Sequence, residues 1–170
     1  MEEEAENYQA ENRQPAGHTR EANLAILYTN LTQHFRLSHE AANFVIMIYK
    51  FSQFFDDIAD GDAITRNDLD LNLYNCFVGL NSNAFFVHHR LSLLPVMDVI
   101  VLKWQASDKA ERDGLADERS FMWRAGFYDL LLLCVSICND HNITKKLAFD
   151  VMTFYAETMD QYRKEFPKNG

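Results

Sequence analysis

The chain has 170 residues, of which 48% are hydrophobic, and this is the size and content of one ordinary domain with a core. Thirteen Phe, seven Tyr and two Trp against six Gly and three Pro favour long packed helices and argue against a β-sandwich or a Rossmann fold, which need more turn residues. The net charge of −9 argues against a protein that coats nucleic acid, because neutralising phosphates supplies most of that affinity.

The first 17 residues are rich in Glu, Gln and Asn and carry almost no apolar side chains, so we expect a disordered acidic arm at 1–17. The start is polar and acidic, whereas a secretory signal is basic and then apolar, and no uninterrupted apolar run reaches the roughly 18 residues that span a bilayer. We therefore expect no membrane partner and a cytoplasmic protein, found in the host cytoplasm or the virion if a phage encodes it. Residues 18–170 are expected to form a single all-α domain, a bundle of five to seven helices.

The first predicted helix is amphipathic and carries apolar side chains at helical spacing. These are Leu24, Leu27, Leu31 and Phe35. Ser38 is a good N-cap for a second helix from about His39 to Asp60, which is expected to end at Gly61 in a left-handed cap. Thr65 begins a capping-box pattern and a short helix through Leu80.

A fourth helical segment is expected from Ala84 to Gly114, where Pro95 either kinks the helix or starts a new one. The fifth helix, about Ala116 to Asn139, is apolar on every face over residues 127–138, so we expect it in the centre of the fold. The last helix follows Thr144. The three cysteines, Cys76, Cys134 and Cys138, lack zinc-type spacing and are interpreted as small core residues.

The stretch FFDDIADGD places Asp56, Asp57 and Asp60 on about a third of the helix surface, and Asp62 follows in the cap. Like charges at these spacings repel, and anions oppose the dipole at a helix C-terminus, each at a cost of about 0.3 to 1 kcal/mol. A bound cation would remove that cost, and Mg²⁺ is typically held by one or two carboxylates with water and phosphate oxygens. The pattern predicts a Mg²⁺ or diphosphate site; the plainer alternative is a solvated helix end.

Two aspartates stand isolated inside apolar helices, Asp98 and Asp129, and both are expected to be largely buried. Each then needs a metal, a cationic partner such as Arg90 or Arg124, or a raised pKa. If either faces the aspartates at 56–60, carboxylates from different helices would converge as they do in helical metal enzymes.

The stretch IYKFSQFFDDIADGD, residues 48–62, resembles the first aspartate-rich motif of squalene and phytoene synthases. These are all-α enzymes in which such aspartates hold Mg²⁺ against a prenyl diphosphate, and the resemblance implies Asp56, Asp57 and Asp60 as metal ligands. Residues 128–162 resemble all-α NTP pyrophosphatases of the MazG and dimeric dUTPase type, which implies a metal-binding role for Asp129. In that family a Glu stands three residues earlier, where this chain has Gly126.

Two classes of function follow. The first is an all-α protein that binds Mg²⁺ through Asp56, Asp57 and Asp60, with Asp129, and binds or acts on a phosphorylated small molecule. The second is a non-catalytic helical interaction protein with a protein partner or a homo-oligomer, such as a phage accessory or virion component. Catalytic residues are not assigned by either, and the nucleophile and phosphate-loop motifs GxSxG and GxxxxGK[ST] do not occur.

Overall fold

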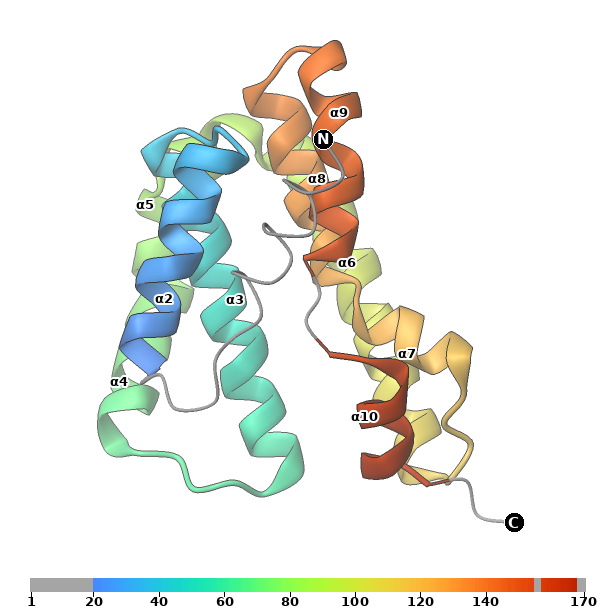
Figure 1. Ribbon diagram of the computed structural model, residues 1–170. Helices are drawn as coiled ribbons and strands as arrows, with labels where there is room; N and C mark the ends of the chain where they lie inside the picture. The colour runs from blue at the N-terminus through green and yellow to red at the C-terminus, as the bar shows by residue number, and fades with distance from the viewer. Residues whose placement is uncertain (1–19, 155–156, 168–170) are drawn as a thin grey trace.

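The computed structural model describes residues 20–154 and 157–167, with side chains from residue 23 onward. Within those ranges the protein is entirely helical and has no strand, which confirms the all-α class (Figure 1). If the two π-helical segments η1 and η2 are counted with the helices they continue, the described chain holds eight helices, slightly more than the five to seven predicted. The predicted disordered arm at 1–17 lies outside the described residues.

The elements follow one another with short connections. They are α2 Arg20–Thr29, η1 Asn30–His34, α3 His39–Asp60, α4 Arg66–Tyr74, η2 Asn75–Gly79, α5 Leu80–Ser82, α6 Ala84–Arg112, α7 Glu118–Arg124, α8 Phe127–Cys138, α9 His141–Thr153 and α10 Met159–Glu165.

Side-chain caps set the ends of α3 and α4 where they were predicted. The Ser38 hydroxyl accepts a hydrogen bond from the Ala41 amide, and Gly61 ends α3 with φ 78° in the left-handed region that glycine enters without strain. Thr65 accepts from the Asp68 amide and begins α4. The helix that α4 begins continues through η2 and α5 to Ser82, two residues beyond the predicted end.

The predicted helix from Ala116 to Asn139 is two helices. The chain turns at Ala125 and Gly126, so that α7 and α8 meet at a bend of 45°. A Cβ atom on Gly126 would lie 3.4 Å from the Ile100 side chain of α6, so glycine allows the start of α8 to approach α6 closely. The last predicted helix begins earlier than expected, at His141 after the N-cap Asp140, and α10 was not predicted.

The core lies between α2, α3, α6, α8 and α9, and α8 runs through its centre as predicted. Four residues of α8 are buried: Leu130, Leu131, Cys134 and Val135. Phe44 of α3 stacks on Phe86 of α6 with ring centroids 5.7 Å apart. In Figure 1, α2 and α3 lie side by side, α8 and α9 form a second pair, and α6 lies behind them.

Two details of the core differ from the expectation. Cys134 is buried and Cys138 partly so, but Cys76 is exposed, so the interpretation of all three cysteines as core residues is wrong for Cys76. Pro95 lies inside α6, and the helix continues through it from Ala84 to Arg112.

Candidate functional site

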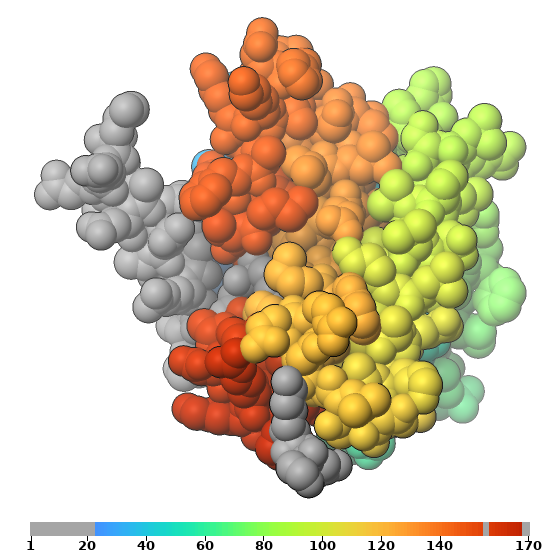
Figure 2. Space-filling view, turned by 90° about the vertical axis from the view of Figure 1, so that its right-hand side faces the viewer, coloured from blue at the N-terminus to red at the C-terminus, as the bar shows by residue number. Residues whose placement is uncertain are grey.

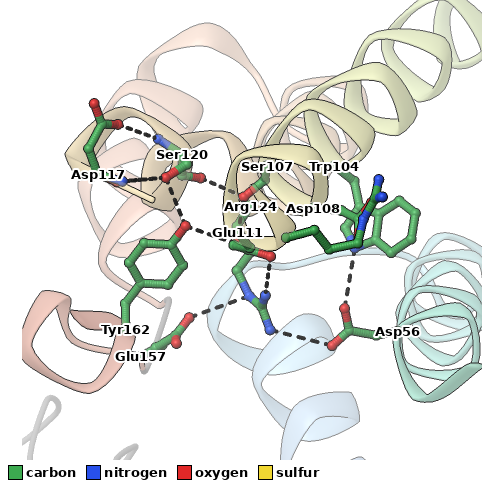
Figure 3. A network of polar contacts seen from close by, with 11 residues as sticks. Asp56, Trp104, Ser107, Asp108, Glu111, Asp117, Ser120, Arg124, Glu157 and Tyr162 are labelled. Atoms are coloured by element: carbon green, nitrogen blue, oxygen red, sulfur yellow. Dashed lines mark hydrogen bonds and ion pairs between the residues drawn. The ribbon is translucent and has the colours of Figure 1, made fainter. Parts of the chain in front are cut away.

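The most connected polar group in the described chain is the guanidinium of Arg124, at the end of α7 (Figure 3). Its side chain is 19% exposed and lies among carboxylates from three directions. The distances are 3.2 Å to Glu111, 3.5 Å to Asp56 and 3.7 Å to Glu157, and the guanidinium carbon stands 5.4 Å from the centre of the Phe166 ring. One cation therefore holds together α3, α6, α7 and the segment before α10.

Hydroxyl groups extend this network to α10. The Tyr162 hydroxyl, on a side chain that is almost fully buried, donates to Glu111 at 2.9 Å and lies 2.8 Å from the Ser120 Oγ. The Ser107 hydroxyl lies 2.8 Å from the same Glu111 oxygen and 2.9 Å from the Ser120 carbonyl oxygen. Burial raises the pKa of Tyr162, so its phenol remains a neutral donor. We call Ser107, Glu111, Ser120, Arg124 and Tyr162 the Arg124 network.

Local sequence positions Ser120 in this network. Asp117 caps α7 by accepting from the amides of Arg119 and Ser120, and the Ser120 hydroxyl accepts in return from the Asp117 amide. Hydrogen bonds from the Arg119 side chain and from the Ser120 amide lower the pKa of Asp117 to about 2. The capping box thus turns Ser120 inward toward Tyr162.

The predicted ligands of α3 lie beside the Arg124 network. Asp56 is bound by Arg124 and accepts a hydrogen bond from the Trp104 indole at 3.3 Å. Asp57 is partly buried and Asp60 is exposed. Loss of some hydration against neighbouring protein atoms, followed by the Asp56 carboxylate, raises the pKa of the exposed Asp60 above its ordinary value, and Arg124 opposes the shift. The part of the predicted site nearest the core is therefore already paired with a cation of the chain.

The fourth predicted ligand is held elsewhere. The Asp129 carboxylate, in the first turn of α8, pairs with Lys103 of α6 at 2.6 Å. Its side chain is 44% exposed, so the expectation that Asp129 is largely buried is wrong, while the expected cationic partner is Lys103. Among the described side chains, no group of three or more His, Cys, Asp or Glu has the arrangement of a metal site. Mg²⁺ binding by Asp56, Asp57, Asp60 and Asp129 stays a prediction.

A second feature is the outward half of α6, which we call the outer face. Its exposed apolar side chains are Val87, Leu91, Leu94, Val99, Val101 and Leu102. Leu91 is 85% exposed, and Figure 2 shows α6 in yellow-green, uncovered along one side of the molecule. The opposite half of the same helix carries the buried residues Phe86, Leu93 and Ser107.

Asp98 lies in the middle of the outer face and is exposed, which corrects the expectation that it is buried. The expectation failed because α6 is apolar on both sides while only one side packs against the protein. Apolar neighbours in the sequence therefore do not signal burial here. Asp98 has no hydrogen-bond or ion-pair partner within the part of the chain that the structure describes.

By length and composition alone, α6 is sufficient to cross a bilayer, and the bent pair of α7 and α8 passes the same test. The sequence of α6 contains no uninterrupted apolar run of this length, because Arg90 and Asp98 lie among its apolar residues. For this reason α6 was not predicted as a span. One side of α6, however, packs against α3, α7 and α8.

Comparison of the chain with models of protein families, with curated proteins and with solved structures found no match.

Sequence reasoning missed the Arg124 network and the outer face. Arg124 is a lone cation in FMWRAGFY, and this was a signal that a carboxylate would meet it. Tyr162 gave no such signal, because its contact with Glu111 joins residues 51 positions apart.

Replacing Tyr162 by Phe removes the phenol and leaves Glu111 and Ser120 without one of their partners. We expect Tyr162→Phe to lower the free energy of unfolding by about 1 to 3 kcal/mol in a denaturant titration. The matched control is Tyr74→Phe, since the Tyr74 side chain is exposed, and it should change stability little. Equal effects of the two variants would contradict a structural role for the network.

The variant Asp60→Asn tests how charge in the same region affects stability. Because the pKa of Asp60 is raised in the folded state, its charge costs stability at neutral pH, and this cost disappears as the pH falls below the ordinary value of 3.8. We expect Asp60→Asn to stabilise the protein at pH 7 by no more than about 0.5 kcal/mol, because solvent screens an exposed group, and to have no effect near pH 3.

The variant Asp113→Asn is expected to change the stability in the opposite direction from Asp60→Asn. A hydrogen bond from Lys109 lowers the pKa of Asp113, so the charge of Asp113 contributes stability above its ordinary pKa, and this contribution is lost as the pH falls through the lowered value. We expect Asp113→Asn to destabilise the protein at pH 7, and a stabilising effect would contradict this account.

Proposed function

We propose that this chain is a non-catalytic helical interaction protein that binds a helix of a protein partner on the outer face of α6. The observation that carries the proposal is an exposed apolar face from Val87 to Leu102 with an unpaired carboxylate, Asp98, at its centre. On a helix of 3.6 residues per turn, these positions share one half of the cylinder.

Burial of the exposed side chains would favour a contact here. Full burial of a Leu or Val contributes about 1.5 to 3 kcal/mol. Leu91 can contribute most of this, whereas the other five side chains are about half exposed and can each contribute about half of it. Contiguous exposed apolar patches of this kind mark sites where another molecule packs. The inner half of α6 is held by the core, so the outer face is presented on a rigid support.

The position of Asp98 favours a protein partner over lipid. A carboxylate at the centre of a membrane-facing surface is costly, whereas an Arg or Lys of a partner helix can pair with it in a protein contact. The last turns of α6 also carry charged side chains, including Lys109, which pairs with Asp113, and Arg112, which pairs with Asp108. A helix with an apolar stripe and a cation opposite Asp98 fits this surface.

Photo-crosslinking tests the proposal in cells that produce the chain. A photoreactive residue in place of Leu91 should crosslink to a protein several-fold more strongly than one in place of Lys164, which is exposed on α10 far along the chain. Asp98→Lys should reduce the crosslink at Leu91, because a partner's cation would then be repelled. Equal yields from the two positions would contradict docking on the outer face.

A second candidate is the Mg²⁺-dependent function predicted from the sequence, in which the protein binds or acts on a phosphorylated small molecule. The observation that favours it is the grouping of Asp56, Asp60 and Asp62 at the end of α3. Desolvation first, and then repulsion by Asp56 and Asp62, raises the pKa of Asp60, and a cation would relieve the repulsion. Arg124 supplies part of that relief already.

Calorimetric titration with Mg²⁺, with and without pyrophosphate, separates the two candidates. The interaction protein predicts no heat of Mg²⁺ binding above that of a control titration into buffer. Saturable heat that Asp57→Asn and Asp60→Asn abolish, while Asp160→Asn on α10 leaves it intact, would establish the metal-binding function instead.

A further inference from the structure

We infer that the occupant of the outer face is a second copy of this chain, whose α6 lies antiparallel to the first. This inference rests on the proposed function and adds the identity of the partner. It depends on the order of apolar and charged residues along α6. When a second α6 runs in the opposite direction, apolar residues meet apolar residues and each charge meets an opposite charge.

In an antiparallel pair, apolar residues of one copy lie level with apolar residues of the other. A two-fold axis at the level of Leu94 places Val87 of one copy at the level of the partner's Val101, and Val101 at the level of the partner's Val87. Val87, Leu94 and Val101 are all exposed. An antiparallel pair of helices in this register buries the apolar residues of both outer faces together.

The charges match in the same register. Arg90 and Asp98 are both exposed, and neither has an ion pair among the described side chains. They stand eight residues apart, about 12 Å along the helix, on either side of the two-fold axis. Arg90 therefore lies beside the partner's Asp98 and Asp98 beside the partner's Arg90, so that the contact contains two ion pairs.

A parallel arrangement in register is disfavoured by the same residues. It would place Arg90 against the partner's Arg90 and Asp98 against the partner's Asp98, and like charges in a desolvated contact are repulsive. The charge pattern therefore selects the antiparallel orientation, as charged flanking positions do in paired helices.

The ends of α6 are consistent with this register. Because α6 begins at Ala84, the partner's helix covers the first copy only as far as the level of Trp104. The charged residues Asp108, Lys109 and Arg112 lie beyond that point, where they keep their own ion pairs in water. The apolar part of the outer face is covered, and the charged last turns are left exposed.

Sedimentation of the purified full chain over a range of concentrations tests the inference with two charge reversals, Arg90→Asp and Asp98→Arg. The unaltered chain should form a dimer. In a dimer of either variant alone, positions 90 and 98 carry the same charge, so both ion pairs become repulsive contacts. The dimer Kd of each variant should therefore rise at least tenfold. An equimolar mixture of the two variants restores both ion pairs and should dimerise as the unaltered chain does.

Circular dichroism should show that both variants keep their helical content, because both side chains are exposed. A monomeric unaltered chain at every concentration, or a mixture that dimerises no better than its components, would overturn the inference. A monomer whose Leu91 position crosslinks to a different protein would refute the second copy and leave the proposed function standing. Flotation with phosphatidylcholine and phosphatidylserine vesicles that is lost in Leu91→Glu would refute both.

Discussion

The structure depends on the way α6 is fixed along one side only. Its inner half packs on Phe44 of α3 through Phe85 and Phe86 and also contacts α8. Its second half is held by polar contacts to α3, α7 and α8. Lys103 pairs with Asp129 of α8, the Trp104 indole donates to Asp56 of α3, and Glu111 meets Arg124 of α7. Packing and charge pairing thus act on the same side of one helix and leave its other side free.

In this arrangement two of the predicted metal ligands, Asp56 and Asp129, form ion pairs that join helices. Asp56 was singled out because it belongs to a cluster of like charges at a helix end, and Asp129 because it is an isolated carboxylate in an apolar helix. Each has a cationic partner from the chain itself. The same physical argument pointed to metal and to cation pairing, and the sequence could not decide between them. Contacts between residues distant along the chain show which cation each of these two carboxylates meets, and Mg²⁺ binding at Asp56, Asp57, Asp60 and Asp129 stays a prediction.

Local signals predicted local structure well. The extent of α3 follows from Ser38 and Gly61, whose cap geometry is set by the residue type alone. The break between α7 and α8 was missed because the apolar pattern runs across Gly126 without interruption, and the contact of Gly126 with Ile100 of α6 is a tertiary contact that the local sequence does not reveal. Asp98 was misplaced for a related reason, since the apolar residues around it form a surface and not a core.

We propose that the outer face of α6 is covered by another polypeptide in solution. Hydroxyl-radical footprinting at increasing protein concentration measures this directly at the side chains concerned. We expect Leu91 and Leu94 to lose reactivity as the concentration rises, while Leu115, which is exposed beyond the C-terminal end of α6 and outside the proposed contact, stays equally reactive. Reactivity of Leu91 and Leu94 that is the same at every concentration, in the purified chain and in the cells that produce it, would contradict the claim.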